Sequence, residues 1–437
     1  MRIVMLAAGA ANMYCGSCLR DNRVASTLIE QGRDVILLPL YTPLRTDEVT
    51  VSRRHVYYAG IDVYLRQKSA VWRSLPRFAT RWVDHPAILR WAGSLATKTD
   101  ARELGDLTLA VLRGAHGPQR AQLAELVDGL RRLEPDVVNL PNLLFLGVAP
   151  ELRNSHNGAI VCTLSGEDLF IDGLPEDARR RVIDQIRTFV PQVDAFIATS
   201  RYYADYCARE YHIPRERIHA VPMGIRVDAA AVPPPRAARR PDEPLLIGYF
   251  ARVCPAKGLL ELARAFVALR AAGRNCTLAA AGYLSASDQP YLDEVRTYLR
   301  RYNADAHFQY LGELSREQKF EFLRSLDIFS VPAPYPEAKG LYLLEAMSCA
   351  VPVVQPDHGS FTELLEHTGG GLLCETGNTD SLAEQLDRLI VDAPLRHKLG
   401  DAGRVAVRER FNDRVMADET WRVYDAARQR RSERVHV

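Results

Sequence analysis

The chain has 437 residues, 25% of them charged, a formal net charge of +2 and eight cysteines. This length favours two domains with a buried core each, and the near balance of acids and bases excludes a global field that would attract nucleic acid. The scattered cysteines exclude a disulfide framework, and the lack of an apolar run of about eighteen residues excludes a membrane span. The N-terminus is only weakly basic, which argues against a signal peptide. We therefore expect a cytoplasmic protein.

Along the first half of the chain, short apolar or β-branched runs alternate with helix-length amphipathic segments. Such alternation predicts βα units, and therefore an α/β fold with parallel sheets. The runs expected to form strands are 2–6, 34–40, 136–140, 159–164, 194–199 and 218–222.

The loop after the first strand contains Cys15, Gly16 and Cys18 and leads into a helical pattern at 23–32. A CxxC pair at the start of a helix is also typical of thioredoxin-like redox sites, because a helix N-terminus lowers the thiol pKa. Nothing that follows matches the rest of a small redox module, and no second pair of ligands for zinc is present. A dithiol oxidoreductase is kept as an alternative function.

Residues 45–115 interrupt the rhythm of the strands and are expected to form a helical insertion. Within it, an apolar face and a basic face can be drawn at helical spacing. The apolar face has Val71, Leu75, Phe78 and Trp82, and the basic face has Arg73, Arg77 and Arg81. This pattern fits either peripheral contact with an anionic membrane or acceptor, or a helix that packs on its domain with solvated arginines. Pro76 argues against a single long helix.

The strand at 159–164 is followed by Ser165, Glu167 and Asp168. Polar side chains at the end of a strand could bind hydroxyl groups of an acceptor or a sugar. Ser165 and Asp168 also have the spacing of a capping box at a helix start. Both interpretations stay open. Ser200, after the next strand, is expected to cap a helix.

A stretch rich in proline, alanine and arginine at 226–243 predicts a linker, because it suits neither a strand nor the interior of a helix. We therefore expect a first domain at 1–225 and a second at 244–410. A helical pattern at 411–437 follows and either extends the second domain or crosses back to the first. In the second half the expected strands are 245–250, 277–282, 307–312, 327–332 and 352–356.

Two cations, Arg252 and Lys257, lie in the loop after the first strand of the second half. Arginine can grip two phosphate oxygens and lysine acts as a point charge, so the pair suits a diphosphate. The alternative is a pair of exposed loop cations without a ligand.

A proline-rich loop with Glu337 follows the strand at 327–332, and Gly340 precedes a helical pattern that contains Glu345. Ligands of open α/β sheets lie beyond the carboxyl ends of the strands. The backbone N–H groups that open this helix would form an anion site. A carboxylate there must face a hydroxyl-bearing part of the ligand, because like charges repel.

Together these two elements resemble the family 4 retaining glycosyltransferases of the GT-B fold. The family pattern is Gly-x-x-Arg-x-x-x-x-Lys-Gly followed by Glu-x7-Glu. Here one extra residue separates Gly248 from Arg252, whereas Glu337 and Glu345 have the family spacing. The resemblance implies two Rossmann-like, doubly wound parallel-sheet domains that face each other across a cleft. It also implies a last helix that crosses back to the first domain.

By this resemblance, Arg252 and Lys257 would hold the diphosphate of a nucleotide-sugar donor. Preorganised cations stabilise the charge that grows on a leaving nucleoside diphosphate. The chain has no Asp-x-Asp pair. We therefore expect no metal and no cofactor, with the two cations in the place of a metal ion.

The resemblance also assigns the two glutamates to different parts of the donor. Glu345 would accept hydrogen bonds from the ribose hydroxyls, and Glu337 would hold the sugar together with the backbone of Gly340 and Leu341. Lys339 stands where the family commonly has an aromatic residue. It adds a further cation beside the phosphate site.

In the first domain, Gly16 matches the family's glycine loop, which implies that it faces the donor phosphate and the acceptor. Ser165 stands where the family often has a histidine that contacts the sugar. Gly359 and Glu363 match a family turn in the second domain. The resemblance is close over the second domain and loose over the first.

These observations predict a retaining glycosyltransferase that moves a hexosyl group from a nucleotide-diphosphate sugar to a carbohydrate, lipid-linked or small-molecule acceptor. A phosphorylase or a nucleotide-sugar epimerase of the same fold is the alternative within this class. We expect the enzyme in the cytoplasm, in solution or peripheral to the inner face of the membrane.

Overall fold

The computed structural model describes residues 1–9, 16–41, 44, 46, 48–53, 101–226 and 243–435. Cys15, most of the predicted linker and the two-faced helical pattern of the insertion lie outside the described residues. The chain divides into two compact units. The first unit comprises Met1–Pro222 and Arg414–Val437, and the second comprises Met223–Asp413.

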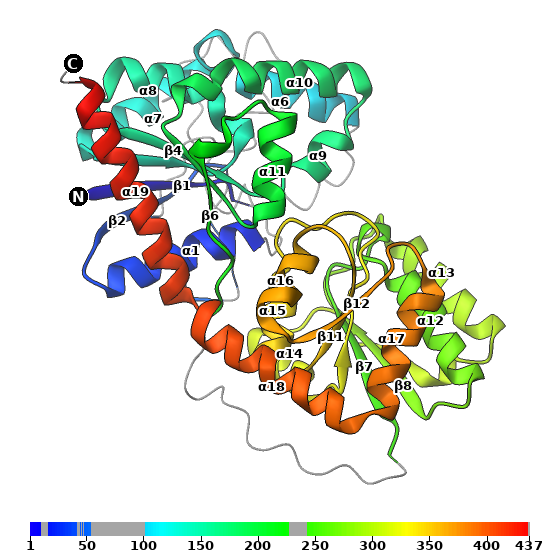
Figure 1. The fold of residues 1–437 in the computed structure, drawn as a ribbon. Helices are drawn as coiled ribbons and strands as arrows, with labels where there is room; N and C mark the ends of the chain where they lie inside the picture. The colour runs from blue at the N-terminus through cyan, green and yellow to red at the C-terminus, as the bar shows by residue number, and fades with distance from the viewer. Residues whose placement is uncertain are drawn as a thin grey trace. The chain divides into compact units, whose positions relative to one another are not determined.

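The first unit is built on a six-stranded parallel sheet in the order β2-β1-β3-β4-β5-β6. Its strands are β1 (Arg2–Ala7), β2 (Asp34–Pro39), β3 (Val137–Leu140), β4 (Ala159–Leu164), β5 (Ala195–Ala198) and β6 (Ile218–Ala220). Its helices are α1 (Gly16–Glu30), α6 (Ala101–Leu112), α7 (Arg120–Leu133), α8 (Ala149–Ser155), α9 (Asp168–Asp172), α10 (Glu176–Phe189), α11 (Arg201–Glu210) and α19 (Asp413–Val435). Helices cover both faces of this sheet (Figure 1).

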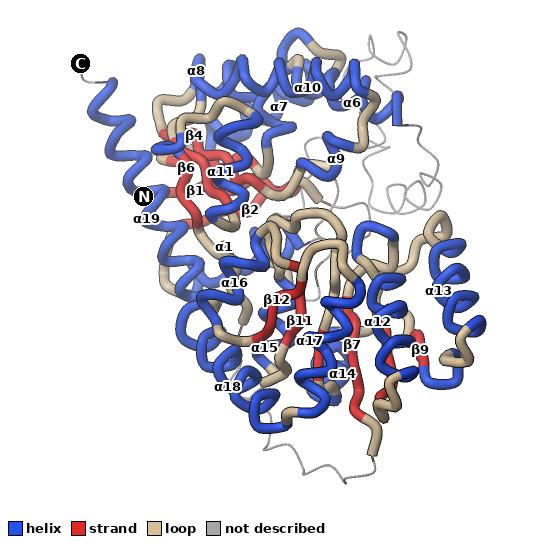
Figure 2. The backbone as a smooth tube through the Cα atoms, turned by 45° about the vertical axis from the view of Figure 1, so that its right-hand side comes forward, coloured by secondary structure: helices blue, strands red, loops and turns tan. Residues whose placement is uncertain are grey.

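The second unit has its own six-stranded parallel sheet, in the order β12-β11-β10-β7-β8-β9. Its strands are β7 (Leu245–Phe250), β8 (Cys276–Ala281), β9 (Phe308–Tyr310), β10 (Ile328–Phe329), β11 (Val353–Pro356) and β12 (Gly371–Cys374). Its helices are α12 (Leu259–Ala271), α13 (Gln289–Arg301), α14 (Arg316–Ser325), α15 (Leu341–Ser348), α16 (Ser360–Thr368), α17 (Thr379–Val391) and α18 (Ala393–Arg410). Figure 2 shows strands and helices alternating along this unit, as the sequence pattern predicts.

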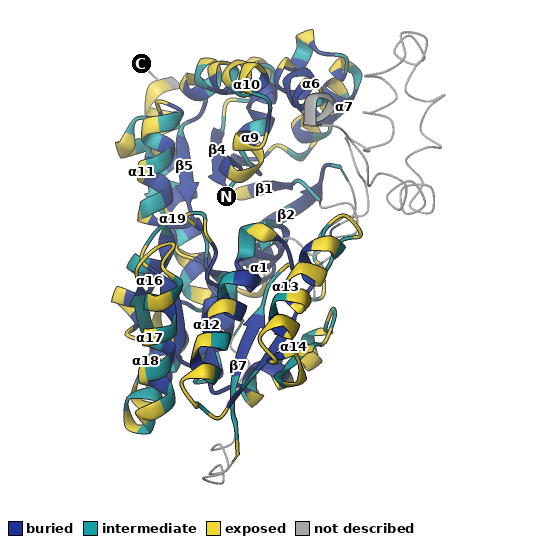
Figure 3. Ribbon diagram, turned by 90° about the vertical axis from the view of Figure 1, so that its right-hand side faces the viewer, coloured by how far each residue is buried: buried dark blue, intermediate teal, exposed yellow. Residues whose placement is uncertain are grey.

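The strands form because their apolar runs are buried on both faces. All residues of β3, β4 and β5 are buried. Figure 3 shows β4 and β5 in the dark blue of buried residues. Parallel strands covered on both sides read as nearly continuous apolar runs, which is why the sequence predicts them. β12 was not predicted, because it is short, begins with a glycine and has three half-buried residues.

Helix α19 packs within the first unit. Its Val423 and Tyr424 belong to the same hydrophobic cluster as Ile3 of β1. At its edge, the guanidinium of Arg33 lies 4.4 Å from the ring centroid of Trp421. No helix among the described residues is both long enough and apolar enough to cross a membrane.

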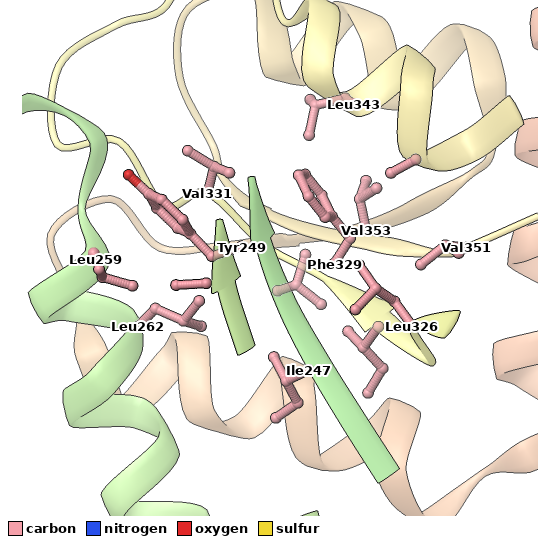
Figure 4. Close-up of a cluster of buried hydrophobic side chains, with 14 of the residues drawn as sticks. Ile247, Tyr249, Leu259, Leu262, Leu326, Phe329, Val331, Leu343, Val351 and Val353 are labelled. Carbon is pink, nitrogen blue, oxygen red and sulfur yellow. The ribbon is translucent and has the colours of Figure 1, made fainter. Parts of the chain in front are cut away.

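The core of the second unit supports the loops that follow β7 and β10. Figure 4 shows side chains of β7 and β10 converging with those of α12 and α15, among them Tyr249, Phe329 and Leu343. Tyr249 is fully buried, yet its hydroxyl donates to the carbonyl of Arg252 at 2.9 Å. The core therefore anchors one of the predicted phosphate-binding residues directly.

Both sheets reverse their strand order beside their first strand, between β1 and β3 and between β7 and β10. In open parallel sheets, ligands bind beyond the carboxyl ends of the strands at such a reversal. In the second unit, the loop after β7 carries Arg252 and Lys257, and the loop after β10 carries Glu337. The fold thus places the three predicted residues at the same edge of one sheet.

Candidate functional site

The loop after β7 is tied closely to the loop after β10. Gly258 adopts φ +76°, and a Cβ atom there would lie 2.0 Å from the carbonyl oxygen of Pro332. Only glycine allows both this backbone conformation and this approach. Lys257 ends a short 3-10 turn just before Gly258, and Arg252 donates from Nε to the sulfur of Cys254 at 3.3 Å.

Lys257 and Glu337 form a direct, almost buried ion pair, although they are far apart in sequence. Their side chains are 15% and 10% exposed. The ammonium of Lys257 also donates to the hydroxyl of Tyr335 at 2.8 Å. The hydroxyls of Tyr335 and Tyr342 each donate to Glu337 at 3.1 Å. The sequence predicted both charged residues for the site, but their pairing and the two phenols were not predicted.

The pair keeps both groups ionised. Burial alone would raise the pKa of Glu337, but the ammonium groups of Lys257 and Lys339 and the hydrogen bond from Tyr342 hold that pKa below its ordinary value. Burial alone would lower the pKa of Lys257, but Glu337 and Tyr335 raise it instead. Burial also raises the pKa of Tyr335 to about 12, so this phenol stays protonated and can donate.

A second loop holds Glu337 in place from the side of β11. The backbone N–H of Ser360 donates to the carbonyl of Glu337 at 2.7 Å. A Cβ atom at Gly359 would lie 2.6 Å from the backbone nitrogen of Glu337, and Gly359 has φ +60°. His358 contacts the carbonyl of Ala333 through Nε2 at 3.0 Å. The turn at Gly359, which the family resemblance implied, therefore fixes the backbone of the loop that carries Glu337.

The loop after β10 ends at Gly340, which precedes α15 with φ +65°. Leu341 is the first residue of α15, so the N–H groups at this helix start lie next to Glu337 and Lys339. The half-buried Lys339 is close enough for its charge to lower the pKa of Glu337. The four predicted residues Glu337, Lys339, Gly340 and Leu341 and the β7 loop thus form one cationic, hydrogen-bonding edge.

Glu345 lies one turn inside α15 and pairs with a residue that the sequence did not single out. Lys319 of α14 donates to Oε1 of Glu345 at 2.8 Å, and the two side chains are 6% and 4% exposed. Lys319 falls in a stretch of mostly polar residues, "SREQKFEF", which is typical of a solvent-exposed helix face. No local signal could have identified this lysine.

In the first unit, the predicted residues Gly16 and Ser165 lie near each other. Gly16 begins α1, and the hydroxyl of the next residue, Ser17, donates to the carbonyl of Ser165 at 3.4 Å. The hydroxyl of Ser165 donates to the carbonyl of Pro141 at 2.9 Å. α9 begins at Asp168 without a side-chain cap, so the capping-box interpretation of Ser165 and Asp168 was wrong. Ser200 does cap α11, because its hydroxyl accepts from the N–H of Tyr203 at 3.1 Å.

Glu167 ties three segments of the first unit together. Its carboxylate accepts from the N–H of Leu143 at 2.9 Å, from the N–H of Ser165 at 2.6 Å and from the hydroxyl of Tyr203 at 3.2 Å. Burial raises the pKa of Glu167, while the backbone hydrogen bonds lower it. The carboxylate of Glu167 thus holds these three segments together at the edge of the sheet. Burial also raises the pKa of the neighbouring Asp168.

Cys18 is buried in the core of the first unit, at 2% exposure. Its predicted partner in a dithiol lies outside the described residues. Within the described parts of the chain, no group of three or more His, Cys, Asp or Glu side chains could hold a metal ion.

Comparisons with known proteins bear on both units. Residues 235–406 match the family described as glycosyl transferases group 1, and residues 99–229 match the family described as Glycosyltransferase Family 4. A D-inositol 3-phosphate glycosyltransferase of Stackebrandtia nassauensis is 29% identical over 294 residues, which cover 65% of this chain and 64% of that protein. This chain thus spans just under two thirds of that relative's length.

Two solved structures share the fold over almost the whole chain. Sucrose-phosphate synthase from Thermosynechococcus elongatus has a TM-score of 0.70 and 17% identity, covering 98% of each chain. Anabaena HepE, in a complex with UDP and glucose, has a TM-score of 0.68 and 16% identity, covering 97% of this chain and 99% of that one.

Proposed function

Because this chain belongs to the glycosyltransferases of the family 4 type and has the GT-B fold, we propose that it is a retaining hexosyltransferase with a nucleotide-diphosphate sugar as donor. The observation that carries the proposal is the buried pair of Lys257 and Glu337 at the strand-order reversal of the second unit. A cation for the phosphate and a carboxylate for the sugar stand there side by side.

The cations act on the leaving group. As the glycosidic bond breaks, negative charge grows on the nucleoside diphosphate, and Arg252 and Lys257 stabilise that charge more than they stabilise the bound donor. The N–H groups at the start of α15 add their dipoles at the same place. Lys339 contributes a third positive charge, so no metal ion is needed to hold the diphosphate.

The carboxylates act on the uncharged parts of the donor. Glu337 accepts hydrogen bonds from sugar hydroxyls, because Tyr335, Tyr342 and Lys257 keep it an ionised acceptor in a fixed position. Glu345 accepts bonds from the ribose hydroxyls. Neither carboxylate serves as a general acid or as a nucleophile in this scheme.

Retention follows if the acceptor attacks on the face that the leaving phosphate occupies. The acceptor hydroxyl forms the new bond to the anomeric carbon as the bond to the diphosphate breaks, and its proton passes to the leaving phosphate oxygen. The cations beside that phosphate lower the barrier by stabilising the separated charges.

The acceptor is assigned to the first unit, near Ser165 and Asp168. The inositol phosphate in the name of the Stackebrandtia relative and the UDP and glucose bound to HepE suggest the kinds of ligand to try first. A carbohydrate, a lipid-linked sugar and a small polyol phosphate are all within the proposal. We place the enzyme in the cytoplasm, in solution or peripheral to the inner face of the membrane.

The proposal is tested by analysing products from the full chain with UDP-, GDP- and ADP-sugars and a panel of acceptors. We expect a new glycoside whose anomeric configuration, read by NMR, is that of the donor. An inverted glycoside, an isomerised donor, or a sugar phosphate formed with inorganic phosphate would contradict the proposal. Insulin disulfide reduction that is lost in Cys18→Ser would instead support the dithiol alternative.

A further inference from the structure

The pair of Lys319 and Glu345 is among the most enclosed ion pairs of the second unit. Nζ of Lys319 lies 2.8 Å from Oε1 of Glu345, and both side chains are less than a tenth exposed. The ammonium also lies 5.9 Å from the ring centroid of Phe250 and 5.2 Å from that of Phe320. Aromatic faces attract a desolvated cation, so the rings help to hold Lys319 in place.

This pair lies at the ligand-binding edge of the sheet. Phe250 is the last residue of β7, Lys319 lies in the first turn of α14, and Glu345 lies in the second turn of α15. The first turns of helices that follow parallel strands lie at the carboxyl ends of those strands. Lys319 is therefore on the same side of the sheet as the Lys257–Glu337 pair.

Stability alone does not account for such a pair. Taking an ammonium and a carboxylate out of water costs about as much as their attraction returns, and a well-packed apolar pair often serves as well. The charge of Lys319 has another consequence, because a hydrogen bond to Oε1 fixes the plane in which the carboxylate of Glu345 lies.

We infer that Lys319 is a positioning residue that makes the donor site selective for ribonucleoside diphosphates over 2′-deoxyribonucleoside diphosphates. The inference rests on the proposed function, in which Glu345 receives the ribose hydroxyls. A carboxylate in a fixed plane accepts from the 2′- and 3′-hydroxyls in one geometry. A ligand without the 2′-hydroxyl forgoes one of these hydrogen bonds, and a site built to bind a hydroxyl rejects ligands that lack it.

The test is to measure binding constants by titration calorimetry for UDP and 2′-deoxy-UDP. GDP and ADP are each compared with their 2′-deoxy forms in the same way. For the nucleotide that binds best, we expect wild type to prefer the ribose form by about 10- to 100-fold. Lys319→Met is expected to bind both forms with the affinity that wild type has for the deoxy form. Glu345→Gln is expected to lose most of the preference as well.

Two further variants keep the test decisive. Lys319→Arg retains the positive charge and is expected to keep most of the preference, even if Lys319→Met fails to fold. Arg274→Met removes the ion pair between Arg274 and Asp387. Arg274 lies just before β8, at the opposite edge of the sheet, so this variant is expected to leave the preference for the ribose form unchanged.

The outcomes separate this inference from the proposed function. The role of Lys319 is overturned if wild type binds the ribose and 2′-deoxyribose nucleotides equally, or if Lys319→Met keeps the full preference. In either case the proposal of a nucleotide-sugar donor remains valid. Failure of wild type to bind any of the nucleoside diphosphates overturns the proposed function, and the inference with it.

Discussion

Lys257→Met is expected to lower kcat/KM for the nucleotide sugar by about 100- to 1000-fold, the range seen when one preorganised donor to a developing anion is removed. Lys257 is the cation that the structure fixes most firmly at the proposed phosphate position, because Glu337 and Tyr335 hold its ammonium on one side. The loss is expected mainly in kcat, since the charge on the diphosphate is largest as the bond to the sugar breaks.

Steady-state kinetics on purified protein measure this effect. Lys398→Met, which changes an exposed lysine of α18 in the same unit, is the matched control and is expected to keep wild-type kinetics. A Lys257→Met variant with kcat/KM within threefold of wild type would remove this residue from the site.

Glu337→Ala is expected to cost both activity and stability, because it leaves the charge of Lys257 buried without its partner. Breaking an enclosed ion pair from one side costs about 3 kcal/mol of unfolding free energy. Transfer is expected to fall by about 100-fold or more, since the sugar loses its acceptor and the cation its position.

A double variant separates the two effects. Lys257→Met with Glu337→Leu replaces the pair by apolar side chains and is expected to recover most of the unfolding free energy while transfer stays low. Denaturant unfolding and kinetics measure the two quantities, with Glu384→Gln on the exposed face of α17 as the control. A double variant as unstable as Glu337→Ala would show that the charges do not act as a pair.

The same pair gives stability a defined pH dependence. The pKa of Glu337 lies below its ordinary value of 4.5, so the stabilisation is present above that pH and is lost as the pH falls through the lowered pKa. The pKa of Lys257 lies above its ordinary value of 10.5, so the stabilisation is present below that pH and is lost as the pH rises. The double variant is expected to lack the acid part of this dependence.

The sequence predicts the strands and the charged site residues for different physical reasons. Strands such as β4 are visible because both faces are buried, whereas β12 is only partly buried and gives no clear pattern. Arg252 and Lys257 are visible because a phosphate site needs cations at the ends of strands, and Glu337 is visible because it lies just before a helix start and has the family spacing to Glu345. These requirements are local in the chain.

The partners of these residues are not visible, because they arise from packing between distant segments. Lys257 and Glu337 meet only because β7 and β10 are neighbours in the sheet. Lys319 meets Glu345 only because α14 packs on α15, and its sequence neighbours give no sign of burial. In the first unit, Glu167 was one of three side chains that could bind hydroxyls, and the structure adds that its carboxylate accepts three hydrogen bonds, two of them from distant segments.

The central claim is that the edge of the second unit formed by Arg252, Lys257 and Glu337 holds the donor. The most direct measurement is a crystal structure with the UDP-, GDP- or ADP-sugar that raises the unfolding temperature most. We expect the diphosphate within hydrogen-bond distance of Arg252 and Lys257, and a sugar hydroxyl on Glu337. A donor bound elsewhere, or a donor here whose diphosphate touches neither cation, would contradict the account.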